Sequence, residues 1–262
     1  MRRTLASIAA LMLASACANA LAAVHVTISG EVTHPGEVAL EGKPRLSDVA
    51  KSAQVTSRAY PLGAAWLRRS LQVEQKRLKT GVTYELGLID KKAMADGNES
   101  LATLARSMRN RIGEMPVTGR LVVRTLEPHA LQVSAPDNRP VEDGDSLVYP
   151  SRPQTVTVMG AVEQVCDLPH EGLKDVRGYL AECVASPFAD RDVVFVIEPD
   201  GEVFEQGVAL WNRSPVMTVA PGAVLYVPLG WRATARAADE RFNRDMADFI
   251  ATQPVGGAGM KP

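Results

Sequence analysis

A repeated strand pattern constrains the fold of this chain more than any other feature. Residues 26–32 read VTISGEV, and residues 156–162 read VTVMGAV. In both copies apolar residues alternate with others, which is typical of a β-strand with one buried face. Gly30 and Gly160 occupy the same place in the two copies, where a bulge or a close backbone approach is expected.

The similarity between the two copies continues downstream of this strand. Residues 46–49 (LSDV) are echoed by residues 173–176 (LKDV), a pattern that indicates the start of a short helix. Residues 143–150 and 220–228 each combine a glycine turn with a last strand that a proline closes. Chance similarity between short β segments is the alternative, which agreement at both ends disfavours. The sequence therefore predicts an α+β protein with two copies of one small unit.

The first copy is longer than the second by about residues 62–115, and this stretch predicts a helical hairpin. Apolar residues follow a loose helical period on both sides of a break at residues 95–98 (ADGN). The stretch is also basic. Its cations are Arg68, Arg69, Lys76, Arg77, Lys79, Arg106, Arg109 and Arg111. A solvated helix face is one interpretation, and a basic groove for an acidic glycan is the other.

Residues 231–252 predict a C-terminal amphipathic helix. Phe242, Met246, Phe249 and Ile250 lie on one side of it, and charged residues of both signs occupy the rest. The apolar side could serve as a docking surface for a partner protein, or it could pack on its own domain. Residues 253–262 contain glycine and proline and predict a flexible tail.

The first 22 residues predict a signal peptide. Arg2 and Arg3 precede an apolar run that is too short to span a bilayer comfortably, and small residues follow it. Cys17 allows a second interpretation, a lipid-anchored form. Lipoprotein signals usually carry a branched apolar residue three positions before the cysteine. That residue is missing here, so secretion into the periplasm ranks first.

Leader removal leaves two cysteines, Cys166 and Cys183, which an oxidising compartment would join. The alternative is a pair of free, buried thiols. A net charge of −1 gives no reason to expect nucleic acid as a partner. The histidines show no metal-ligand spacing, and no nucleophile elbow, phosphate loop or dinucleotide fingerprint is present. The sequence therefore predicts no catalytic residue, no metal and no cofactor.

Taken together, these patterns resemble the GfcC family of capsule and exopolysaccharide biosynthesis proteins, over nearly the whole mature chain. The motifs that carry the resemblance are Val26–Val32 with Pro35-Gly36, Ala59-Tyr60-Pro61 with Leu67-Arg68, Val117-Thr118-Gly119-Arg120, Asn138 with Val141–Asp145, and Arg152-Pro153 leading into Val156–Val162. Their common order along the chain strengthens the match.

The resemblance implies two tandem β-grasp domains, similar to the soluble-ligand-binding (SLBB) modules of outer-membrane polysaccharide exporters. The expected boundaries are residues 23–153 for the first domain with its helical insertion, 154–230 for the second, and 231–252 for the terminal helix. It also implies a periplasmic protein without a transmembrane segment once the signal peptide is removed.

Three functional hypotheses follow. In the first, the protein is a non-enzymatic accessory of polysaccharide export that binds an outer-membrane exporter, another envelope component or an acidic polysaccharide. In the second it is a polysaccharide-modifying enzyme, with Arg120, Arg124 and Arg68 lining a pocket in the first domain. For Arg120 the alternative role is structural, as a salt bridge or carbonyl cap. In the third, fold analogy alone suggests a small-ligand carrier.

Overall fold

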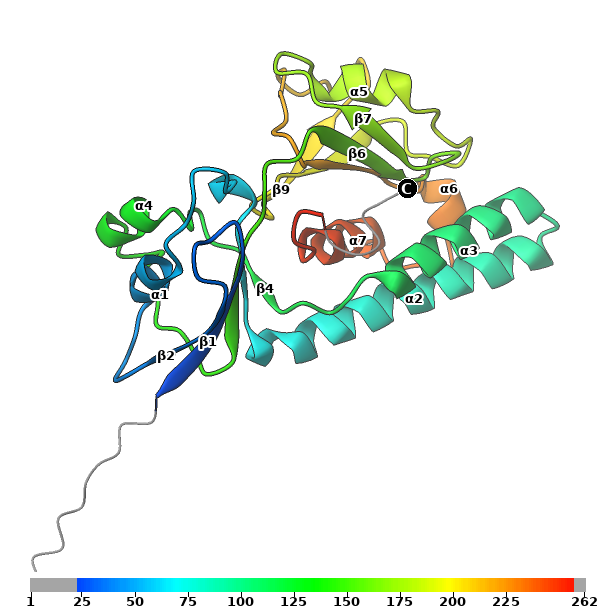
Figure 1. Cartoon of the computed structure of the whole chain (residues 1–262). Helices are drawn as coiled ribbons and strands as arrows, with labels where there is room; N and C mark the ends of the chain where they lie inside the picture. Colours follow the sequence, from blue (N-terminus) through cyan, green and yellow to red (C-terminus); the bar gives the residue numbers. More distant parts are fainter. Residues whose placement is uncertain (1–22, 257–262) are drawn as a thin grey trace, which may run out of the picture.

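The computed structural model describes residues 23–256 and shows two α+β modules in tandem (Figure 1). The expected signal peptide and Cys17 lie outside the described residues, as do residues 257–262. None of the helices found between residues 23 and 256 combines the length and the apolar character needed to cross a membrane.

Each module is built on a five-stranded mixed sheet. The first contains β1 (Val24–Gly30), β2 (Gly36–Leu40), β3 (Ala65–Leu67), β4 (Arg120–Leu121) and β5 (Asp145–Tyr149), in the spatial order β2-β1-β5-β3-β4. The helices α1 (Leu46–Ala53) and α4 (Pro128–Val133) pack on one face. Along β1 and β5 buried residues alternate with more exposed ones, so the opposite face is less covered.

The second sheet repeats this topology. It contains β6 (Thr155–Gly160), β7 (Cys166–Pro169), β8 (Val193–Ile197), β9 (Val203–Gly207) and β10 (Val224–Val227), in the order β7-β6-β10-β8-β9. The helix α5 (Val176–Glu182) corresponds to α1. In both modules the first and last strands are parallel and central. The predicted pair of β-grasp units is thereby confirmed.

The repeated glycine ends the first strand of each module in the same way. Gly30 has φ +94° and Gly160 has φ +108°, a region that favours glycine. Directly after them, the amide of residue 31 donates to Tyr149 O at 2.7 Å, and that of residue 161 donates to Val227 O at 2.8 Å. A Cβ atom on either glycine would lie about 2 Å from the same carbonyl oxygen, at 2.0 Å and 2.2 Å respectively. The close backbone approach expected from the repeat is therefore present in both copies.

A helical hairpin interrupts the first module between β3 and β4. It consists of α2 (Gln72–Ala95) and α3 (Glu99–Glu114), and Asn98 caps α3 by accepting from the amide of Leu101. The helical period predicts an insert from residue 62, but residues 62–71 form the strand β3 and two short 3₁₀ turns, η1 (Pro61–Gly63) and η2 (Arg69–Leu71). Strand pairing with β5 outweighs the apolar period there, because Trp66 is needed in the first core.

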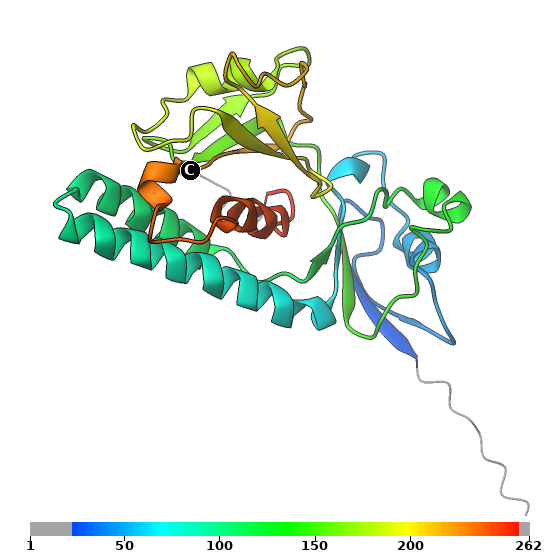
Figure 2. The same cartoon turned by 180° about the vertical axis from the view of Figure 1, so that it is seen from behind.

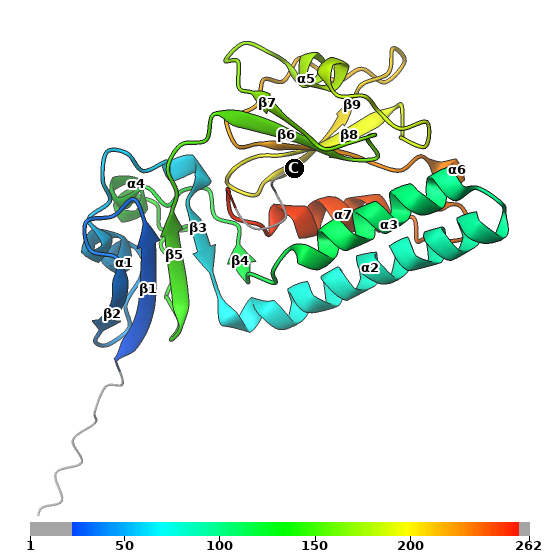
Figure 3. The same ribbon diagram turned by 45° about the vertical axis from the view of Figure 1, so that its right-hand side comes forward.

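The hairpin packs on the second module and not on the sheet from which it emerges. Its buried residues, such as Leu86 and Ile112, share one core with the second sheet. Figures 2 and 3 show the hairpin running beneath that sheet, with α7 (Phe242–Ala251) between them. The insertion therefore joins the two modules physically.

The C-terminal segment is helical in two pieces. A short helix α6 (Trp231–Thr234) is followed by an irregular stretch and then by α7. Phe242, Met246, Phe249 and Ile250 are all buried between the second sheet and α2. The chain itself therefore covers this apolar side, which agrees with the alternative that the helix packs on its own protein. The side is not free to dock a partner.

The predicted start of a flexible tail at residue 253 also differs from the structure. Gln253 is buried, and its side-chain amide donates to Pro116 O at 3.1 Å. Its amide carbonyl oxygen has no hydrogen-bond partner, so one polar atom is left unpaired in this joint. Hydrogen bonds with Pro116 and Arg120 across the module junction hold this residue, and the local composition does not reveal them.

Candidate functional site

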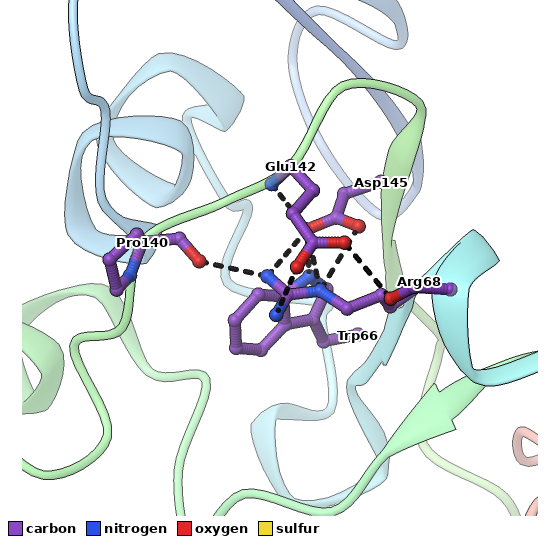
Figure 4. Close-up of polar contacts among 6 residues, drawn as sticks. Trp66, Arg68, Pro140, Glu142 and Asp145 are labelled. Atoms are coloured by element: carbon purple, nitrogen blue, oxygen red, sulfur yellow. Dashed lines mark hydrogen bonds and ion pairs between the residues drawn. The ribbon is translucent and has the colours of Figure 1, made fainter.

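The three arginines predicted as ligand-binding residues lie in three different environments. Arg68 follows β3 and closes a cluster inside the first module (Figure 4). Its guanidinium pairs with Asp145 at 3.0 Å and with Glu142 at 3.1 Å, and it stacks on Trp66 with 4.4 Å between the guanidinium carbon and the ring centre. Arg68 is therefore engaged by its own module.

Asp145 is the centre of this cluster, with its side chain only 1% exposed. Besides Arg68, it accepts from the indole nitrogen of Trp66 at 2.8 Å and from the amide of Glu142 at 2.9 Å. A buried carboxylate is tolerated when it is paired and hydrogen-bonded in this way. The cluster therefore locks the turn before β5 to the end of β3.

Arg120 is buried at the junction between the modules, with 5% of its surface exposed. Its guanidinium donates to Ala251 O at 3.2 Å, to Gln253 O at 3.0 Å and to Pro199 O. Burial lowers the pKa of Arg120 to about 10, against an opposing effect of nearby Asp200, so the side chain stays charged at neutral pH. These contacts match the carbonyl-cap alternative.

Arg124 does not share a strand face with Arg120, because β4 ends at Leu121. Its side chain is 69% exposed and approaches Asp137 at 3.6 Å. The alternation that would have aligned Arg120 and Arg124 is broken by the irregular backbone after β4. The structure thus brings no two of the three arginines into a common pocket.

A groove of about 730 Å³ lies elsewhere, between α3 and the second module. One wall is α3, and the other consists of the turn after β6 and residues 186–188. Its lining comprises Ser100, Thr103, Leu104, Ser107, Met108, Arg111, Ile112, Met159, Gly160, Val162, Glu163, Gln164, Val165, Ser186, Pro187, Phe188, Tyr226 and Met246. This volume falls in the range of ligand-binding sites.

Uncharged hydroxyl and amide side chains contribute polar surface to this groove. Ser100, Thr103, Ser107 and Gln164 are exposed along the two walls. Apolar lining residues such as Ile112 and Tyr226 are buried beneath them, whereas Pro187 is exposed and Leu104, Val165 and Phe188 are half-buried. Sequence reasoning missed this groove, although the serine and threonine residues at helical spacing on α3 were a local signal.

The predicted disulfide flanks the groove and is confirmed. Cys166 and Cys183 are bonded, with an S–S distance of 2.00 Å and 6.1 Å between their Cα atoms. Residues 163–165 of one wall directly precede Cys166, and residues 186–188 of the same wall follow Cys183 closely. The bridge therefore ties together the two segments that form the wall opposite α3.

A titratable group that the sequence did not single out lies near Arg120. Glu198 stands at the turn between β8 and β9, and burial raises its pKa to about 7. Burial raises the pKa of Tyr60, in the first module, to about 12, and the nearby Glu198 charge adds a smaller contribution in the same direction. Among residues 23–256 no group of three or more His, Cys, Asp or Glu side chains could hold a metal ion.

Comparisons with known proteins agree with the architecture. The model of the family described as "Capsule biosynthesis GfcC, N-terminal" matches residues 20–152, and that described as "Capsule biosynthesis GfcC C-terminal" matches residues 164–254. A relative from Escherichia coli (strain K12), the "Uncharacterized protein YjbG", is 30% identical over 201 residues, which is 76% of each chain. The resemblance inferred from the motifs is confirmed, and the chain belongs to the GfcC family of capsule biosynthesis proteins.

Proposed function

We propose that this protein is a periplasmic accessory of capsule or exopolysaccharide assembly that acts by binding a glycan or the export machinery. Family membership supports a role in capsule assembly. The observation that carries the binding role is the groove between α3 and the second module, because its two walls come from different modules. One ligand in the groove can therefore contact both modules at once.

Binding accounts for the groove better than glycoside hydrolysis does. Glycosidases use two carboxyl groups that flank the scissile bond. Within the described lining of the groove, Glu163 is the one carboxylate. Asp145, which lies two residues from Asp143 in the sequence, binds Arg68 and Trp66 in the first core. These side chains therefore favour recognition over bond cleavage.

The disulfide supports a location outside the cytoplasm. A bond between Cys166 and Cys183 persists in an oxidising compartment such as the periplasm. A signal peptide at residues 1–22, as the sequence predicts, would deliver the chain there.

A rigid apolar loop supports contact with a protein of the export machinery. Leu210 is 86% exposed and Trp211 is 76% exposed in the connection between β9 and β10. The indole nitrogen of Trp211 donates to Asp192 Oδ1 at 3.1 Å, and Asn212 donates to Asp192 O at 2.9 Å. Preorganised, exposed tryptophan is typical of interface hot spots.

The cellular experiment uses deletion of the gene and complementation with matched variants. Ser107→Trp fills the groove from an exposed position on α3, and Thr80→Trp adds the same bulk to an exposed position on α2. We expect deletion to lower cell-surface polysaccharide, Thr80→Trp to restore it and Ser107→Trp to fail. Unchanged surface polysaccharide after deletion would contradict the proposed function.

The loop is tested separately by affinity capture from envelope extracts. Trp211→Ala removes the exposed indole, so we expect it to release an outer-membrane exporter or another export component that the wild-type chain retains. Equal capture by both chains would remove the loop from the proposal.

A further inference from the structure

The groove continues into a second hollow along α3. This hollow has a volume of about 390 Å³ and shares Thr103, Ser107 and Arg111 with the groove. Its remaining lining consists of Arg106, Asn110 and Glu114. The two hollows therefore form one continuous track along the outer side of α3, which we call the α3 track.

We propose that the α3 track binds an internal segment of a glycan chain and reads it through hydroxyl groups and apolar ring faces, not through charge. This inference rests on the proposed function, because it names the ligand class of the same groove. Three properties of the track support it: the chemistry of its accessible side chains, its balance of charges and its open form.

Uncharged hydroxyl and amide side chains are exposed on both sides of the α3 track. Ser100, Thr103, Ser107, Asn110 and Gln164 are all exposed there. Such groups can donate and accept hydrogen bonds, as sugar hydroxyls also do. Each pair of neighbouring groups can therefore exchange bonds with a polyhydroxylated ligand.

Buried apolar side chains form the floor of the track. Met108, Ile112, Met159 and Met246 are buried beneath the walls. Helix-in-groove recognition needs a broad accessible apolar stripe. Phe188 is half-buried, so its ring leaves a limited apolar surface of the kind that one face of a sugar ring can cover.

Charges along the α3 track balance. Arg106 and Arg111 provide two cations, and Glu163 and Glu114 provide two anions. Arg106 also pairs with Asp90 at 2.9 Å. Without an excess of one sign, long-range attraction gives no preference for an acidic chain. The geometry therefore does not favour the interpretation that the basic helical insert forms a groove for acidic glycan.

The form of the track suits a polymer. Both hollows are open to solvent, and together they follow several turns of α3 from Ser100 to Glu114. A chain can lie along such a track without its ends being recognised, whereas a small cofactor would need an enclosed site.

The direct test measures binding by the purified mature chain. The probes are oligosaccharides released from the surface polysaccharide of the source bacterium and separated into neutral and acidic fractions. Binding is followed by calorimetry at low and high salt. We expect binding that ionic strength leaves unchanged, and a loss of about tenfold or more, roughly 1.4 kcal/mol, in Ser107→Trp. Thr80→Trp should bind like the wild type.

Gln164→Ala provides a second variant from the opposite wall, so the test does not depend on one substitution. We expect it to weaken binding with unchanged circular dichroism, because Gln164 is exposed. Binding of the acidic fraction alone, with a steep loss at high salt, would overturn recognition through hydroxyls. No binding of either fraction would overturn the glycan assignment. If the deletion phenotype persists in either case, the accessory function stands.

Discussion

Replacing Arg120 by alanine should separate the two modules energetically. The side chain donates to three backbone carbonyls, from Pro199, Ala251 and Gln253, which belong to the second module and the C-terminal segment. A hydrogen bond from a charged donor contributes about 1.5–3 kcal/mol, and partial rescue by water reduces the loss. We therefore expect a decrease of roughly 3–5 kcal/mol in the free energy of unfolding.

Such a loss is a large part of the total stability of a protein of this size, which is typically about 5–15 kcal/mol. It corresponds to a fall of about 10 °C in melting temperature. Arg120→Lys keeps the charge but cannot reach several acceptors with a rigid fork, so an intermediate effect is expected. Thermal unfolding followed by circular dichroism and by tryptophan fluorescence, to which buried Trp66 contributes, measures both variants.

Arg124→Ala is the matched control, because it removes the same side chain four residues away. Arg124 is exposed and makes one long ion pair, so its removal should cost less than about 1 kcal/mol. Equal melting temperatures for the two alanine variants would refute the assignment of Arg120 as the joint between the modules. A stable Arg120→Ala chain with lost surface polysaccharide would instead restore Arg120 as a ligand-binding residue.

Three further predictions concern other parts of the fold. The folded chain holds a proton on Glu198 up to its pKa of about 7, whereas the unfolded chain releases it near the ordinary glutamate pKa of 4.5. The stability that this difference contributes is therefore full below about pH 4.5 and is lost as the pH rises through 7. Glu198→Gln should remove that dependence and stabilise the chain at pH 8 by roughly 1–2 kcal/mol in urea titrations, after allowance for solvent screening; an unchanged pH profile would contradict it. Reduction of Cys166–Cys183 opens a loop of 17 residues, so the same titrations should show a loss of about 3 kcal/mol, and identical midpoints with and without reductant would argue against it. Gly160→Ala places a Cβ atom 2.2 Å from Val227 O at φ +108°, so it should lower the free energy of unfolding by about 2 kcal/mol or more. Gly172→Ala serves as the control, because its Cβ atom meets nothing within 4 Å. The melting temperature of this control should be close to that of the wild type.

The fold followed from the sequence wherever the pattern was local or duplicated. The strand repeat fixed the equivalence of Gly30 and Gly160, and the helical period correctly indicated a hairpin that the break near Asn98 divides. Where a segment fitted both a helical and a strand pattern, its helical period led to the wrong prediction. Leu67 fits the helical stripe, yet it lies in β3 because its neighbour Trp66 fills the first core.

The groove could not be predicted because its walls meet only through long-range packing. Thr103 and Gln164 are far apart in sequence and lie in different modules, and each looks like an ordinary surface residue. The arginines illustrate the opposite error. A cation in a tight motif suggested a ligand site, whereas Arg120 is needed to satisfy backbone carbonyls at the junction.

Two sequence differences between the repeats explain which sheet receives the helical hairpin. Ser29 on β1 corresponds to Met159 on β6, and Val148 on β5 corresponds to Tyr226 on β10, each facing away from the helix of its own module. The larger residues of the second sheet, Met159 and Tyr226, are buried against α3 and α7, whereas Ser29 and Val148 of the first sheet remain partly exposed. Burial of each such side chain is worth about 1.5–3 kcal/mol, which favours docking of the hairpin on the second module.

This docking couples the joint to the groove. Met159 and Tyr226 lie at the bottom of the groove, so the contacts that hold α3 on the second sheet also set the distance between its walls. A ligand that bridges both walls binds the docked arrangement more tightly than an undocked one, and it therefore stabilises docking in proportion to its affinity. Conversely, weakening the joint at Arg120 should lower the affinity of the groove although Arg120 does not line it. Weaker glycan binding by Arg120→Lys that accompanies its intermediate loss of melting temperature would report on the coupling between modules, whereas weaker binding at an unchanged melting temperature would indicate a direct contact.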